Sequence, residues 1–137
     1  HVIPAIFRRF HAARERGDES ISIWGTGQAR REFLCVDDMV EGCFFLLEHY
    51  KENKPINIGF GTDVSIAELA ETVKEVVGFK GRLEFDTSKP DGMPRKLVDS
   101  TRMEQLGWKA NTSLREGLAS VYAWYLDKLK HPEGARL

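Results

Sequence analysis

The residues best suited to chemistry surround a tryptophan and a glycine-flanked turn. Trp24 ends an alternating segment, residues 25–27 read Gly-Thr-Gly, and Arg30 and Arg31 follow shortly after. A guanidinium group binds phosphate oxygens through paired hydrogen bonds and stays charged at any working pH. An indole offers a flat apolar surface to a base. This combination suits a ligand with a base and a pyrophosphate, although a hairpin with surface arginines, or a Trp24 buried in the core, fits the same residues.

The composition is that of an ordinary globular domain. The chain has 137 residues, enough to bury a core, with 42% hydrophobic residues and a formal net charge of −1. Such a charge creates no field that attracts nucleic acid or an anionic membrane, so any anion site must be local. Cys35 and Cys43 lack metal-ligand spacing and are typical of thiols in a reducing cytoplasm. We expect a cytoplasmic protein with no metal site that binds neither nucleic acid nor membranes.

The periodicity of apolar residues predicts a mixed α/β order with short strands. Apolar residues recur at three- and four-residue steps in helices and alternate with polar residues in strands. A polar segment with several Lys, Pro, Asp and Gly residues is expected to be flexible. The predicted helices cover residues 4–16, 37–50, 65–78, 101–107 and 113–131, the strands or extended pieces cover 20–24, 32–36, 55–59 and 81–86, and the flexible segment covers 87–96.

Several polar residues are interpreted as helix caps and not as nucleophiles. Ser65 and Ser113 each precede a glutamate by three residues, the pattern of a capping box, and Thr101 has the same spacing. Asp37 or Asp38 is expected to cap the helix that follows it. That helix is apolar over a wide arc, which predicts burial on more than one side.

Three collinear segments resemble one enzyme family over essentially the whole chain. They read HVIPA at residues 1–5, REFLCVDD at residues 31–38 and SKPDGMPRK at residues 88–96. The second segment by itself marks only the superfamily of nucleotide-sugar epimerases and dehydratases. With the third segment, the chain resembles the C-terminal part of the GDP-L-fucose synthase family, a branch of the extended short-chain dehydrogenase/reductases.

The resemblance implies an architecture. Residues 1–137 would be the C-terminal substrate-binding region of a longer α/β protein, with helices and short strands but without most of the Rossmann sheet. Residues 37–59 would pack back on a missing N-terminal Rossmann domain, and the full-length protein would be a homodimer. Because the chain has no Gly-rich loop, NADP(H) would be bound mainly by residues outside this segment. The segment alone would then be inactive.

The resemblance also implies an activity and a set of residues. The family converts GDP-4-keto-6-deoxy-D-mannose to GDP-L-fucose by epimerisation at C3 and C5 and NADPH-dependent reduction at C4. Epimerisation needs a proton donor beside the sugar, and His1 would be that acid and would also contact the cofactor. The expected substrate-binding residues are Arg9 and Arg31 on the pyrophosphate, Trp24 on the base or ribose, and Lys89 and Asp91 along the cleft.

Other interpretations remain open from the sequence. His1 could be a solvated residue at the chain end, and Arg8 and Arg30 are expected to be solvated. Cys35 is expected to be structural. The protein could act on a different nucleotide sugar as another epimerase or reductase, or it could be a binding module without catalysis.

Overall fold

The computed structural model describes residues 2–131, which form five helices and five short strands. None of these helices is both long enough and apolar enough to cross a membrane. The elements, in chain order, are α1 (Val2–Arg16), β1 (Ser20–Trp24), β2 (Arg30–Arg31), α2 (Val36–His49), β3 (Val64–Ser65), α3 (Ile66–Val77), β4 (Arg82–Asp86), β5 (Arg95–Lys96), α4 (Thr101–Leu106) and α5 (Leu114–Lys130).

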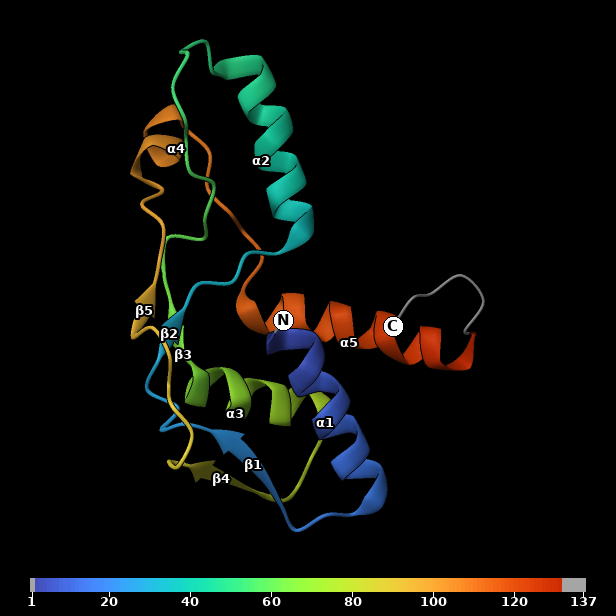
Figure 1. Cartoon of the computed structure of the whole chain (residues 1–137). Coiled ribbons are helices and arrows are strands. Elements are labelled where there is room, and N and C mark those ends of the chain that lie inside the picture. The colour runs from blue at the N-terminus through green and yellow to red at the C-terminus, as the bar shows by residue number, and fades with distance from the viewer. Residues whose placement is uncertain (1, 132–137) are drawn as a thin grey trace.

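The larger of two apolar clusters lies where α1, α3 and α5 meet the strand pair β1–β4 (Figure 1). Phe10, Leu69 and Val73 are fully buried there. The two strands pair in parallel, with Trp24 opposite Asp86 at their C-terminal ends. Helices and strands each contribute one apolar face to this cluster, as amphipathic elements of this period must.

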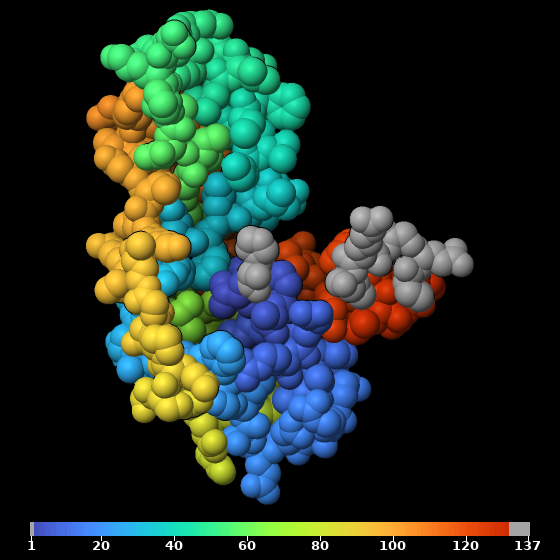
Figure 2. Space-filling model, in the orientation of Figure 1, coloured from blue at the N-terminus to red at the C-terminus, as the bar shows by residue number. Residues whose placement is uncertain are grey.

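A smaller cluster lies at the opposite end of the molecule. It contains Met103, Trp108 and Ala110, and α2, α4 and the connection between α2 and β3 surround it. In Figure 2 a notch separates α2, in teal, from α5, in red. The described structure is thus elongated, with one apolar cluster at each end.

A three-stranded sheet connects the two ends. Its strands are ordered β3-β2-β5, with β2 antiparallel to β3 and parallel to β5. Each strand is only two residues long. The small sheets agree with the mixed α/β class predicted from the sequence.

One predicted strand is wrong, because within the described residues the segment 55–59 belongs to no strand. Beside the extended piece predicted at 32–36, strand pairing is confined to β2 at Arg30–Arg31. A strand needs a neighbour for its N–H and C=O groups, and periodicity alone does not reveal where that neighbour lies. The alternative of a hairpin with surface arginines does not hold either, because β1 pairs with β4.

The capping boxes of α3 and α5 are confirmed at Ser65 and Ser113. The other predicted caps are wrong. Helix α2 begins after Cys35 without a side-chain cap, and α4 begins after Ser100. The carboxylate of Asp38 is buried and accepts two hydrogen bonds of 2.9 Å, from the Thr112 amide and hydroxyl.

The wide apolar arc of α2 is covered on one side only. Phe45 and Leu46 pack on the smaller cluster. The remainder of the arc stays exposed, so the predicted burial on more than one side does not occur within the described chain. These exposed residues are Val36, Met39, Val40, Phe44 and Leu47, which we call the α2 apolar face.

The connection between β4 and β5, predicted to be flexible, is fastened to the glycine-flanked turn. The Asp91 carboxylate accepts hydrogen bonds of 2.6 Å from both the amide and the hydroxyl of Thr26. A Cβ atom on Gly25 would lie 2.1 Å from an Asp91 oxygen, and Gly25 has a positive φ of 82°. Only glycine allows this close approach at that backbone angle. Asp91 therefore clamps one side of the connection onto the turn.

Acid should open this clamp. The hydrogen bonds from the Thr26 hydroxyl and amide lower the pKa of Asp91. The ionised Asp91 carboxylate therefore stabilises the clamp fully at pH values above the ordinary pKa of an aspartate. This stabilisation is lost as the pH falls through the lowered pKa of Asp91. In NMR spectra, we expect the Thr26 amide resonance to titrate with an apparent pKa below that of an aspartate in an unstructured peptide.

Two variants control this titration. Asp91→Asn should abolish the acid shift of the Thr26 amide, and Thr26→Val should raise its midpoint by removing one donor. A Thr26 amide that titrates identically in Asp91→Asn would show that the clamp does not form in solution.

Candidate functional site

A cavity of about 490 Å³ lies between α1, the end of β1, β2 and the β4–β5 connection. Four of the six predicted site residues line it: Arg9, Trp24, Arg31 and Asp91. They come from four separate parts of the chain, and only the fold brings them together. We call this cavity the cleft. The residues that line it are Val2, Ala5, Ile6, Arg9, Ile23, Trp24, Arg31, Glu32, Phe33, Ile66, Pro90, Asp91 and Lys96.

Lys89 is not among the residues that line the cleft. The Lys89 ammonium lies 6.0 Å from the centroid of the Trp24 ring, within range of a cation–π contact at the rim. His1 lies outside the described residues. Its predicted roles as acid and cofactor contact therefore stay predictions.

The indole of Trp24 is 69% exposed. This rules out the alternative in which Trp24 fills the core. Its position at the last residue of β1, opposite Asp86, places it at the end of the strand pair. An exposed ring beside a cavity is available for stacking on a planar group.

Three cationic side chains line the cleft: Arg9, Arg31 and Lys96. Arg9 donates to the Ser22 carbonyl, and Arg31 Nη1 donates to the Arg30 carbonyl at 2.7 Å. Both bonds are to neutral backbone oxygens, so neither guanidinium is neutralised by them. A phosphate anion would make stronger, charge-assisted hydrogen bonds with the same donors.

Sequence reasoning assigned no role to Lys96. Its place in the cleft follows from the parallel register that sets it opposite Arg31. The motif at residues 88–96 contains Lys96, but nothing local in the motif shows which strand it joins. The register between β2 and β5 is the missing signal.

The two carboxylates of the cleft already have donors. Asp91 is bound by Thr26, as described above. Glu32 accepts the Gly61 amide at 2.8 Å and the Val98 amide at 3.2 Å. Backbone N–H groups and the Thr26 hydroxyl satisfy these oxygens, and no ion pair among the described residues joins them to Arg9, Arg31 or Lys96.

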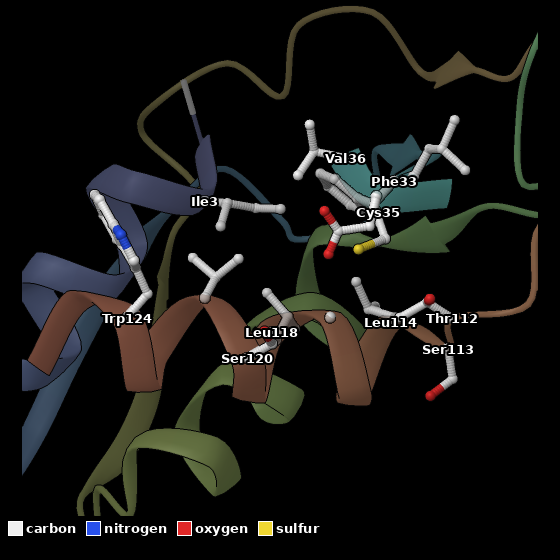
Figure 3. Close-up of a pocket in the computed structure, with 14 residues that line it drawn as sticks. Ile3, Phe33, Cys35, Val36, Thr112, Ser113, Leu114, Leu118, Ser120 and Trp124 are labelled. Carbon is white, nitrogen blue, oxygen red and sulfur yellow. The ribbon is translucent and has the colours of Figure 1, made fainter. Parts of the chain in front are cut away.

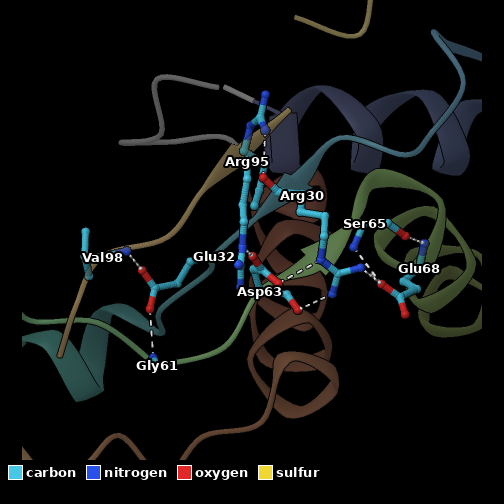
Figure 4. A network of polar contacts seen from close by, with 9 residues as sticks. Arg30, Glu32, Gly61, Asp63, Ser65, Glu68, Arg95 and Val98 are labelled. Carbon is cyan, nitrogen blue, oxygen red and sulfur yellow. Dashed lines mark hydrogen bonds and ion pairs between the residues drawn. The ribbon is translucent and has the colours of Figure 1, made fainter. Parts of the chain in front are cut away.

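Arg30, predicted to be solvated, is ion-paired with Asp63, and 42% of its side chain remains exposed (Figure 4). Its Nε lies 2.8 Å from one Asp63 oxygen, and the other oxygen binds Arg95 Nε. Arg30 also lies 3.5 Å from Glu68. The hydrogen bond from Arg95, and then that from Arg30, lowers the pKa of Asp63. Asp63 thus stays ionised between two strands.

A second cavity, of about 460 Å³, is mostly apolar, although Asp37, Thr112, Ser113 and Ser120 also line it (Figure 3). It lies between the start of α1, residues 33–37 and α5, where the Cys35 thiol, Val36 and Trp124 are among the residues that line it. It lacks a cluster of charged groups comparable to that of the cleft. Among residues 2–131, no three His, Cys, Asp or Glu side chains gather to hold a metal ion.

Comparison with known proteins shows that the chain is similar to part of several nucleotide-sugar enzymes. The model of the NAD dependent epimerase/dehydratase family matches residues 1–59. GDP-L-fucose synthase 1 of Arabidopsis thaliana is 55% identical over 92% of this chain and 39% of its own length. The chain therefore spans about two fifths of the curated relatives it matches.

Solved structures agree with this relationship. A GDP-L-fucose synthetase from Naegleria fowleri bound to NADP superimposes with a TM-score of 0.89 at 25% identity, over all of this chain and 42% of that one. The GDP-mannoheptose C4 reductase MlghC of Campylobacter jejuni, with NADP bound, gives a TM-score of 0.81 at 38% identity, over 92% of this chain and 45% of that one. The chain is thus similar in sequence and in fold to enzymes of the NAD-dependent epimerase/dehydratase family, and among them to the GDP-L-fucose synthases.

Proposed function

We propose that this chain is the nucleotide-sugar-binding part of a cytoplasmic enzyme that converts GDP-4-keto-6-deoxy-D-mannose to GDP-L-fucose. The observation that carries the proposal is the cleft, where three cations and an exposed indole surround one cavity. Arg9, Arg31 and Lys96 would bind the diphosphate. Trp24 would pack on the base or ribose, with Lys89 at the rim of the same ring.

The chemical step would use groups outside the cleft residues. In the family that this chain resembles, the C3 and C5 epimerisations need an acid, and His1 is the candidate for that role. NADP(H) would supply the hydride for reduction at C4. The described parallel pairs β1–β4 and β2–β5 carry no Gly-rich turn into a helix, which is the usual cradle for a dinucleotide pyrophosphate. The cofactor would therefore be held mainly by residues outside this chain.

The α2 apolar face would pack on the dinucleotide-binding sheet domain of the longer protein. The relatives are more than twice as long as this chain, so a second domain of that size is available to cover it. Face residues Phe44 and Leu47 are largely exposed here, and exposed apolar side chains grouped on one helix are typical of an interface. The complete enzyme would act as a homodimer.

Arg31→Ala should weaken GDP binding by about 1.5–3 kcal/mol, the value of a charge-assisted hydrogen bond to phosphate. Calorimetric titration of this chain with GDP measures the loss. Arg8→Ala is the matched control, because Arg8 is an exposed arginine of α1 that does not line the cleft. Its affinity for GDP should equal that of the unsubstituted chain.

The same titration separates the competing functions. Tighter binding of UDP or a UDP-sugar than of GDP would favour another epimerase or reductase of the family. Equal affinities for GDP in the unsubstituted chain and in Arg31→Ala would remove Arg31 from the site. A coding sequence that starts immediately before residue 1 would favour a binding module without catalysis.

The α2 apolar face should make this chain associate with itself when no sheet domain covers it. Leu47→Lys places a charge on the most exposed residue of the face, which should shift the chain towards the monomer in sedimentation velocity. Met93→Lys is the control, because Met93 is similarly exposed but lies in the β4–β5 connection. A chain that is monomeric without any substitution would argue against an interface on α2.

A further inference from the structure

The three-stranded sheet beside the cleft is too short to fix its own register. Each strand contributes two residues, whereas strands usually have about five or six. A slip of one residue would turn the side chains of a strand to the opposite face. Contacts outside the ladder must therefore hold β2 against β5.

The register divides four cations between the two faces of this sheet. Arg30 lies opposite Arg95, and Arg31 lies opposite Lys96. Successive residues of a strand point to opposite faces. Accordingly, Arg31 and Lys96 line the cleft, while Arg30 and Arg95 meet Asp63 away from it (Figure 4).

A single carboxylate joins the two strands on the face away from the cleft. The Asp63 side chain is 5% exposed and uses one oxygen for Arg30 and the other for Arg95. The Asp63 carbonyl also accepts from Arg30 Nη2 at 2.9 Å. Without the carboxylate, two guanidinium groups would face each other on neighbouring strands, where like charges repel.

We propose that Asp63 is a positioning residue for the diphosphate site, because it holds Arg30 and Arg95 together and thereby keeps Arg31 and Lys96 on the cleft face. The proposal rests on the proposed function for the ligand. Asp63 itself touches no ligand. It acts as an anchor for the strands that carry the binding cations.

Asp63→Asn tests this role, because the amide has the shape of the carboxylate without its charge. Calorimetry with GDP and with guanosine distinguishes a positioning effect from general damage. We expect the GDP affinity to fall about tenfold, the loss of one charge-assisted contact, while the guanosine affinity stays within about twofold. Damage to the whole fold would reduce both affinities equally, and that result would overturn the proposal.

Glu68→Gln is the matched control. Glu68 also lies near Arg30, but it does not reach β5, and glutamine retains the capping box with Ser65. Its affinity for GDP should not change. Arg95→Gln is a second test if Asp63→Asn does not fold, because this substitution breaks only the link between Asp63 and β5. It should still weaken the binding of GDP more than the binding of guanosine.

Hydrogen exchange tests the anchor without any ligand. The Arg30 and Glu32 amides donate to the Pro94 and Lys96 carbonyls across the two strands. Asp63→Asn should reduce the protection of these two amides and leave the α3 amides unchanged. If the unsubstituted chain binds GDP no better than guanosine, the proposed function fails, and this exchange alone decides the role of Asp63. Unchanged protection would overturn that role, as would unchanged GDP affinity in a chain that does bind GDP.

Discussion

The ion pairs of Asp63 with Arg30 and Arg95 are the constraint on which the cleft depends. They join β2 to β5 from the face away from the cleft, so that Arg31 and Lys96 can face the cavity. Burial of a carboxylate is costly unless it is paired and hydrogen-bonded, and here both oxygens have a guanidinium donor. The negative charge of Asp63 therefore lies on the face of the sheet away from the cleft, and the positive charges of Arg31 and Lys96 lie on the cleft face.

Hydrogen bonds of two further carboxylates, Glu32 and Asp91, also hold the segments around the cleft in place. Glu32 directly follows β2 and accepts hydrogen bonds from the amides of Gly61, which precedes β3, and Val98, which follows β5. Asp91 fastens the connection before β5 onto the turn after β1. Each of the three carboxylates therefore joins segments that are distant in the chain. Acidic residues thus hold together the segments that form the cleft. Among the described residues, they form no ion pair with the cations that line it.

Local features of the fold were predictable from the sequence, whereas pairings were not. The capping boxes at Ser65 and Ser113 are complete within four residues, and β1 follows from strict alternation. Strand β2 has no such pattern, because its identity comes from partners about 35 and 65 residues away. Asp38 looked like a cap, but the distant Thr112 provides its donors. In the site, the resemblance selected four residues that line the cleft, while Lys96 required the register.

Strand β2 also has a consequence for how the molecule assembles. Its partners β3 and β5 are far from it in the sequence. Pairing these strands therefore closes long loops, and the entropy of loop closure is lost before the strand contacts can compensate for it. Helices with complete caps can form early because their contacts are local. We therefore expect the cavity to form late during folding, after the helices.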